Sequence, residues 1–63
     1  MTTDAKLKAV RREIAMRERV YPNRVANGRM TQFEADREIA VMRAIEQDYA
    51  DRTERERNQL DLF

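Results

Sequence analysis

The 63-residue sequence contains no cysteine, histidine, serine or tryptophan. Without cysteine the chain cannot form a disulfide, and without cysteine and histidine it lacks the usual ligands of a structural zinc site. The same three residue types, cysteine, histidine and serine, supply most catalytic bases and nucleophiles, so we expect a protein that is not an enzyme and that binds no cofactor or metal. A chain this short buries only about 60% of its unfolded surface, so it needs regular helix packing or self-association.

Long apolar runs are absent as well. No stretch approaches the roughly 20 apolar residues that span a membrane. The first four residues, Met1 to Asp4, lack the basic start and apolar core of a signal peptide. Together with the missing cysteines, these features predict a cytoplasmic protein that does not contact a membrane.

Charged residues are abundant, at 40% of the chain, but the net charge is only +1. Residues 1–30 contain eight basic and three acidic side chains, a net charge of +5, and residues 31–63 contain five basic and nine acidic side chains, a net charge of −4. This division predicts two segments that complement each other. Direct nucleic-acid binding through the basic half is the less favoured alternative, because Glu13, Glu18 and the acidic second half weaken its positive field.

The first apolar pattern predicts a helix over residues 4–20, with Asp4 as its N-cap. Apolar residues recur at helical spacing, at Leu7, Val10, Ile14 and Tyr21. Pro22 disfavours a helical conformation for the residue before it, so the helix is expected to end there. Proline also suits a first helical position, and glycine suits the left-handed residue that closes a helix, so Pro22 and Gly28 predict one short helical turn over residues 22–27.

A second helix is predicted over residues 32–50. Thr31 and Glu34 have the spacing of a capping box, in which each side chain bonds the backbone N–H of the other residue. One side of this helix then carries an apolar stripe made of Ala35, Ile39, Met42, Ile45 and Tyr49. Val41 lies on the flank of this stripe.

Residues 1–50 are therefore expected to form one all-α domain, an antiparallel helical hairpin with a short helical turn at the bend. Residues 51–58 contain no apolar side chain, so residues 51–63 are predicted to be a flexible polar arm that projects past the hairpin. Two hairpins in a four-helix bundle would bury both apolar stripes better than one hairpin alone. A homodimer or a higher oligomer is therefore favoured over a monomer.

The arm ends in three large apolar side chains, within the sequence Gln59, Leu60, Asp61, Leu62 and Phe63. Such side chains at a solvated end of a chain gain by leaving water when they bind a partner. A short extended peptide on a polar arm is a common way to present a docking motif.

These five residues resemble the clamp-binding peptide of bacterial replication and repair proteins, whose pattern is Gln-Leu-(Ser or Asp)-Leu-Phe. Every position matches. The resemblance implies that the partner is the bacterial sliding clamp, the beta subunit of DNA polymerase III. It covers five residues only, so it implies a partner and not a fold. The body, in residues 21–31 and 34–42, resembles small uncharacterised proteins of bacterial and phage genomes, which implies a helical hairpin and a bacterial or phage source.

The resemblance also implies a role for each position. Gln59 would form hydrogen bonds at the mouth of the clamp's pocket, Leu60 would occupy a shallow apolar subsite, and Asp61 would face solvent. Leu62 and Phe63 would fill the deep subsite and act as anchors. Phe63 is the last residue of this sequence, which would place a free carboxylate beside the apolar pocket, unlike in most members.

An alternative keeps the tail within the protein. In a longer second helix, Leu60 and Phe63 would return to the core-facing side and pack there. Leu62 would then face away, and Thr53 and Glu56 would interrupt the stripe, which favours the docking motif. The expected function is an accessory protein that modulates replication or repair, or recruits another component to it. The alternative is a helical oligomerisation or scaffold module.

Overall fold

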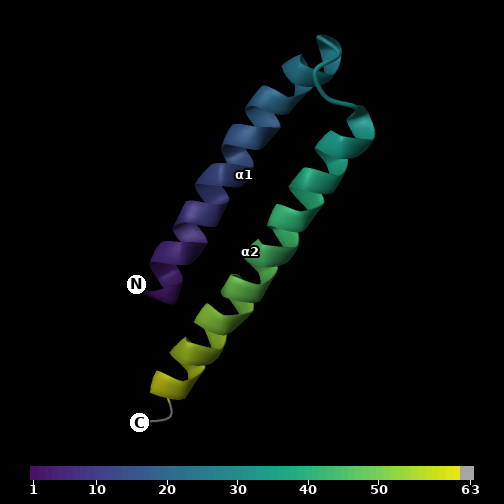
Figure 1. The fold of residues 1–63 in the computed structure, drawn as a ribbon. Helices are drawn as coiled ribbons and strands as arrows, with labels where there is room; N and C mark the ends of the chain where they lie inside the picture. Colours follow the sequence, from purple (N-terminus) through teal and green to yellow (C-terminus); the bar gives the residue numbers. More distant parts are fainter. Residues whose placement is uncertain (62–63) are drawn as a thin grey trace.

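The computed structural model describes the backbone of residues 1–61 and the side chains of residues 1–60. Two helices, α1 (Thr3–Ala26) and α2 (Gln32–Asp61), lie side by side and run in opposite directions (Figure 1). This arrangement confirms the predicted all-α antiparallel hairpin. The hairpin is 54 Å long and only 16 by 14 Å across, so every side chain lies near the surface. Neither described helix has a stretch both long and apolar enough to cross a membrane.

The cap of α1 is Thr2. Its Oγ1 accepts a hydrogen bond from the Ala5 N–H at 3.1 Å, which satisfies one of the free donors at the start of the helix. The prediction of Asp4 as the N-cap is therefore wrong. Asp4 instead lies in the first turn, where a carboxylate favours the positive end of the helix, and it pairs with the Lys8 ammonium at 3.2 Å.

The C-terminal part of α1 passes through Pro22 and ends at Ala26. The predicted end at residue 20 is therefore wrong, and the predicted short turn is helical but continuous with α1. Proline inside a helix loses one hydrogen bond and crowds the carbonyl four residues earlier. Packing against α2 offsets this cost, because Tyr21 is buried, Val25 is half-buried, and both lie beside Ala35 of α2.

The bend between the helices has the hydrogen bonds of a Schellman motif. The Arg29 N–H donates to the Arg24 carbonyl at 2.9 Å, and the Gly28 N–H donates to the Val25 carbonyl at 3.1 Å. Gly28 has a φ of 73°, in the left-handed region that side chains disfavour. This confirms the prediction that Gly28 closes the helical turn.

The start of α2 confirms the predicted capping box. The Glu34 N–H donates to Thr31 Oγ1 at 3.0 Å, and Glu34 Oε1 accepts from the Thr31 N–H at 3.4 Å and from the Thr31 hydroxyl at 3.0 Å. Both residues thus satisfy donors that the first turn of the helix would otherwise leave free.

The core is a single row of side chains between the helices. Its buried apolar members are Leu7, Ile14, Tyr21 and Ala35, all four of them predicted. Three further residues of the predicted α2 stripe, Ile39, Met42 and Tyr49, are only half-buried. Ile45, also predicted to lie in the core, is 36% exposed. α1 covers only a narrow strip of the surface of α2, and the apolar stripe of α2 is wider than that strip, so part of the stripe stays exposed.

The predicted polar arm is helical as far as Asp61, and α2 crosses the predicted boundary between residues 50 and 51 without a break. The Thr3 hydroxyl donates to Glu56 Oε1 at 3.0 Å, so residues 51–56 lie alongside the first turns of α1. Only the last turns of α2 extend past α1 (Figure 1). The predicted end at residue 50 is wrong because arginine and glutamate are good helix formers and Arg52 pairs with Glu56 at 3.4 Å.

Ion pairs between the helices fix their relative position along the hairpin. Arg11 Nε lies 3.2 Å from Glu46 Oε2, and Arg17 Nη1 lies 3.5 Å from Glu38 Oε2. These two pairs match basic residues of the first half with acidic residues of the second, as the charge distribution predicted. Glu18 and Arg43 form a pair of the opposite polarity. All are partly exposed, so each contributes about 0–1 kcal/mol.

Candidate functional site

The candidate docking residues begin on the last turn of α2. Gln59 is exposed, Leu60 is 75% exposed, and Asp61 is the final residue of the helix. Leu62 and Phe63, the two predicted anchors, lie outside the described residues. The structure therefore places the first three residues of the motif at one tip of the hairpin.

No part of α1 covers Leu60. Because Thr3 at the start of α1 already meets Glu56, the turn with Gln59 and Leu60 lies beyond the end of the neighbouring helix (Figure 1). The exposed fraction of Leu60 is similar to that of Phe33, a surface residue of the first turn of α2. Leu60 is thus not a core residue of its own hairpin, in contrast to the alternative in which the tail packs against α1.

The end of α2 is weakly held. Its last turn contains no basic residue that would favour the negative end of the helix dipole. The last four carbonyls of a helix have no partner within it. Unwinding this turn would break few hydrogen bonds, and the side chains of Gln59 and Leu60 are already exposed. An extended conformation of this turn is therefore accessible at a small cost in free energy.

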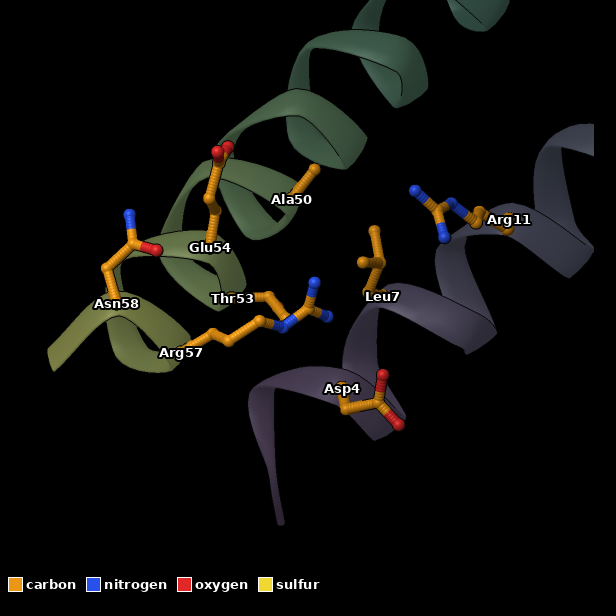
Figure 2. Close-up of a pocket in the computed structure, with 8 residues that line it drawn as sticks. All are labelled: Asp4, Leu7, Arg11, Ala50, Thr53, Glu54, Arg57 and Asn58. Atoms are coloured by element: carbon orange, nitrogen blue, oxygen red, sulfur yellow. The ribbon is translucent and has the colours of Figure 1, made fainter. Parts of the chain in front are cut away.

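A shallow groove lies between the helices just before this tip. Ala50 and Thr53 of α2 are too short to fill the space opposite Leu7 of α1, and Arg57 reaches from α2 toward α1 (Figure 2). The hydroxyl oxygen of Thr53 is buried without a hydrogen-bond partner among the described residues. The groove is lined by Asp4, Leu7, Arg11, Ala50, Thr53, Glu54, Arg57 and Asn58.

Among the residues that the structure describes, no three acidic side chains are arranged to hold a metal ion. The groove is a packing gap at the open end of the hairpin.

Several basic side chains of α1 are engaged within the chain. Lys8 pairs with Asp4, Arg11 with Glu46, and Arg17 with both Glu13 and Glu38. Glu13 and Arg17 lie four residues apart on α1 and pair at 2.9 Å, and the hydrogen bond to Glu13 raises the pKa of Arg17 above its ordinary value. These carboxylates reduce the positive field that a nucleic-acid backbone would meet.

One group of exposed apolar residues was not predicted as a site. Val41 is 48% exposed and Ile45 is 36% exposed, and both lie on the same side of α2, one turn apart. The position of Val41 on the flank of the apolar stripe was the sequence feature that pointed to this surface.

Comparisons with known proteins give no relative from which a function could be transferred. The chain matches no protein-family model, no curated protein and no solved structure.

Proposed function

We propose that this protein is an accessory factor that binds the bacterial sliding clamp in the cytoplasm through residues 59–63. The observation that carries the proposal is the Gln-Leu-Asp-Leu-Phe sequence, which begins on an exposed turn at the tip of the hairpin. By resemblance to clamp-binding peptides, Leu62 and Phe63 are the anchors and Gln59 is the polar contact. Binding by such a peptide concentrates the free energy in a few apolar side chains.

The geometry of the tip supports this proposal in two ways. Leu60 is already exposed, so the hairpin need not open to present it. The last turn of α2 is also unsupported by α1, so it can become extended when the peptide enters a groove on the partner. The cost of that unwinding lowers the affinity, but it leaves the core from Leu7 to Tyr21 intact.

The test is a calorimetric titration of the protein into purified bacterial sliding clamp, with two matched variants. Phe63→Ala removes a proposed anchor, whereas Phe33→Ala removes the same ring from an exposed site on the first turn of α2. We expect Phe63→Ala to weaken binding at least about 30-fold, the equivalent of a loss of about 2 kcal/mol at a hot spot, and Phe33→Ala to leave it unchanged.

Two results would contradict the proposal. One is the absence of binding heat, at more than one temperature, with a protein whose circular dichroism shows intact helices. The other is an equal loss of affinity in both variants, because the Phe63 ring would then have no special role. A double variant, Leu62→Ala with Phe63→Ala, extends the test to both anchors and is expected to abolish binding.

A further readout separates a competitor from a recruiter. If the hairpin only occupies the clamp's pocket, it will displace a bound peptide of the same sequence pattern from the clamp, and the amount displaced will follow the affinity of this protein. A recruiter would instead form a three-component complex through a different surface of the hairpin. The clamp titration comes first, because both roles require it.

A further inference from the structure

The hairpin exposes more surface than a compact protein of its mass. Its accessible surface is 5165 Å². The relation between surface and mass for monomeric proteins gives about 4,250 Å² at 7.5 kDa, an excess of about 900 Å². This excess is close to the area of about 800 Å² that each partner buries in a standard protein interface.

Part of this exposed area forms an apolar face along one side of the hairpin. We define the apolar face by Val10 of α1 and by Val41, Ile45 and Tyr49 of α2. At 100° per residue, all four side chains are turned in the same sense away from the direction that faces the other helix. Because the two helices are antiparallel, the same sense of rotation on each leads to the same side of the hairpin. Val41 and Ile45 are the most exposed of the four.

Contacts between the helices confirm that the two sides of the hairpin differ. On the side of the apolar face, the Lys6 ammonium lies 5.9 Å from the centre of the Tyr49 ring, and Arg17 bonds Glu38. The opposite side carries the pairs of Arg11 with Glu46 and of Arg43 with Glu18. Both sides thus carry contacts of charged side chains, and the four residues of the apolar face lie together on the first side.

The two helices carry opposite charge. α1 contains seven basic and three acidic side chains, a net charge of +4, and α2 contains five basic and nine acidic side chains, a net charge of −4. A second hairpin therefore fits best when its α2 lies on α1 of the first, because stacking α1 on α1 would bring like charges together.

From the exposed area, the apolar face and this charge division, we propose that two copies of the chain associate through the apolar face into a four-helix bundle, with α1 of each copy packed on α2 of the other. This arrangement needs a two-fold axis parallel to the helices, and it makes all neighbouring helices antiparallel. Both bends lie at one end of the bundle, and both turns with Gln59 and Leu60 lie at the other end.

The positions of the helices along the hairpin show which residues would meet. Arg11 lies level with Glu46, and Arg17 lies level with Glu38. A two-fold axis parallel to the helices adds no shift along them, so the second copy presents the same levels. Val10 of one copy then packs on Ile45 and Tyr49 of the other. These contacts form a second apolar layer between the two hairpins.

The first test is the mass of the full chain in solution, measured by sedimentation equilibrium up to about 1 mM, the weak limit of specific association. We expect twice the 7.5 kDa of the single chain. Val41→Lys places an unpaired charge on each side of the interface and should weaken the dimer at least about 100-fold. Ala44→Lys, on an exposed position of the next turn that faces away from α1, should leave the dimer unchanged.

Three results would overturn the proposal. A single-chain mass at every concentration would mean that a second copy does not cover the apolar face. A dimer that survives Val41→Lys, or that both lysine variants disrupt equally, would mean that a different surface associates. A failed clamp titration would not change these masses, so this inference and the proposed function stand or fall separately.

The second test determines the arrangement without changing the interface. Because the chain has no native cysteine, Asn27→Cys at the exposed bend gives a single site for a spin label. With α1 on α2, the two labels should lie within about 30 Å, the width of a four-helix bundle with its labels. Labels separated by nearly the full 54 Å of the hairpin, or by no measurable distance, would overturn the proposed stacking.

Discussion

Ile14 is the side chain on which the stability of the hairpin depends most directly. It lies at the middle of the buried row, between Leu7 and Tyr21, and only 4% of it is exposed. Replacing a buried isoleucine by alanine costs about 2–5 kcal/mol, and the cost falls where neighbouring side chains can close the space. No large side chain of the described core is completely buried, so we expect Ile14→Ala to cost about 2–3 kcal/mol, at the lower end of that range.

This loss is large for a chain of 63 residues, whose free energy of unfolding is expected to be about 3–9 kcal/mol. Each kcal/mol lowers the midpoint of thermal unfolding by about 4–8 °C in a domain of this size. Ile14→Ala should therefore lower it by about 8–24 °C. The assay is urea and thermal unfolding followed by far-ultraviolet circular dichroism, at one fixed protein concentration because association would also shift the midpoint.

Phe33→Ala is the matched control. It removes a larger side chain than Ile14→Ala does, but from a position that is 74% exposed, so its cost should stay within about 0.5 kcal/mol. Equal destabilisation by the two variants would refute the reasoning, because it would mean that the row between the helices is not the core. A cost for Ile14→Ala below about 1 kcal/mol would have the same meaning.

Three further substitutions test local features, each by the same unfolding assay. Thr31→Ala removes the capping box and should cost about 1 kcal/mol, whereas Thr31→Ser should restore most of the loss; equal loss in both would contradict the hydroxyl's role. Pro22→Ala restores a helical N–H inside α1 and should stabilise the protein by about 1–3 kcal/mol, and destabilisation would show that the ring itself packs. Thr53→Val removes a buried hydroxyl that lacks a partner among the described residues and should stabilise by about 1 kcal/mol, whereas a loss would indicate that the hydroxyl is bonded in solution.

Local sequence patterns were sufficient where a feature depends on neighbours in the chain. The capping box needs only a threonine and a glutamate three residues apart, and the structure has its hydrogen bonds. Gly28 was identified by its residue type, because a left-handed backbone favours glycine. The spacing of Leu7, Ile14 and Tyr21 likewise follows from helical periodicity, and these three residues are buried.

The candidate docking residues were found from the sequence by a motif and not by helical periodicity or capping patterns. The motif at residues 59–63 is a pattern of side chains, so the printed sequence contains all of its information. The structure adds that Leu60 is exposed on a turn beyond the end of α1, and it adds nothing on Leu62 and Phe63, which lie outside the described residues. The second exposed surface, with Val41 and Ile45, needed the structure because both residues also fit a buried stripe.

By itself, then, the sequence determined that the chain is two amphipathic helices joined by a tight bend, with a peptide motif at the C-terminal end. Only the tertiary structure decided where the helices end and how much of each apolar stripe is covered. α1 continues past Pro22 because Tyr21 and Val25 pack against α2, and α2 continues past residue 50 beside the start of α1. The physical reasons differ: at Pro22 a local cost of about 1–3 kcal/mol is outweighed by contacts that the neighbouring helix supplies, whereas past residue 50 good helix formers and the Arg52–Glu56 pair extend α2.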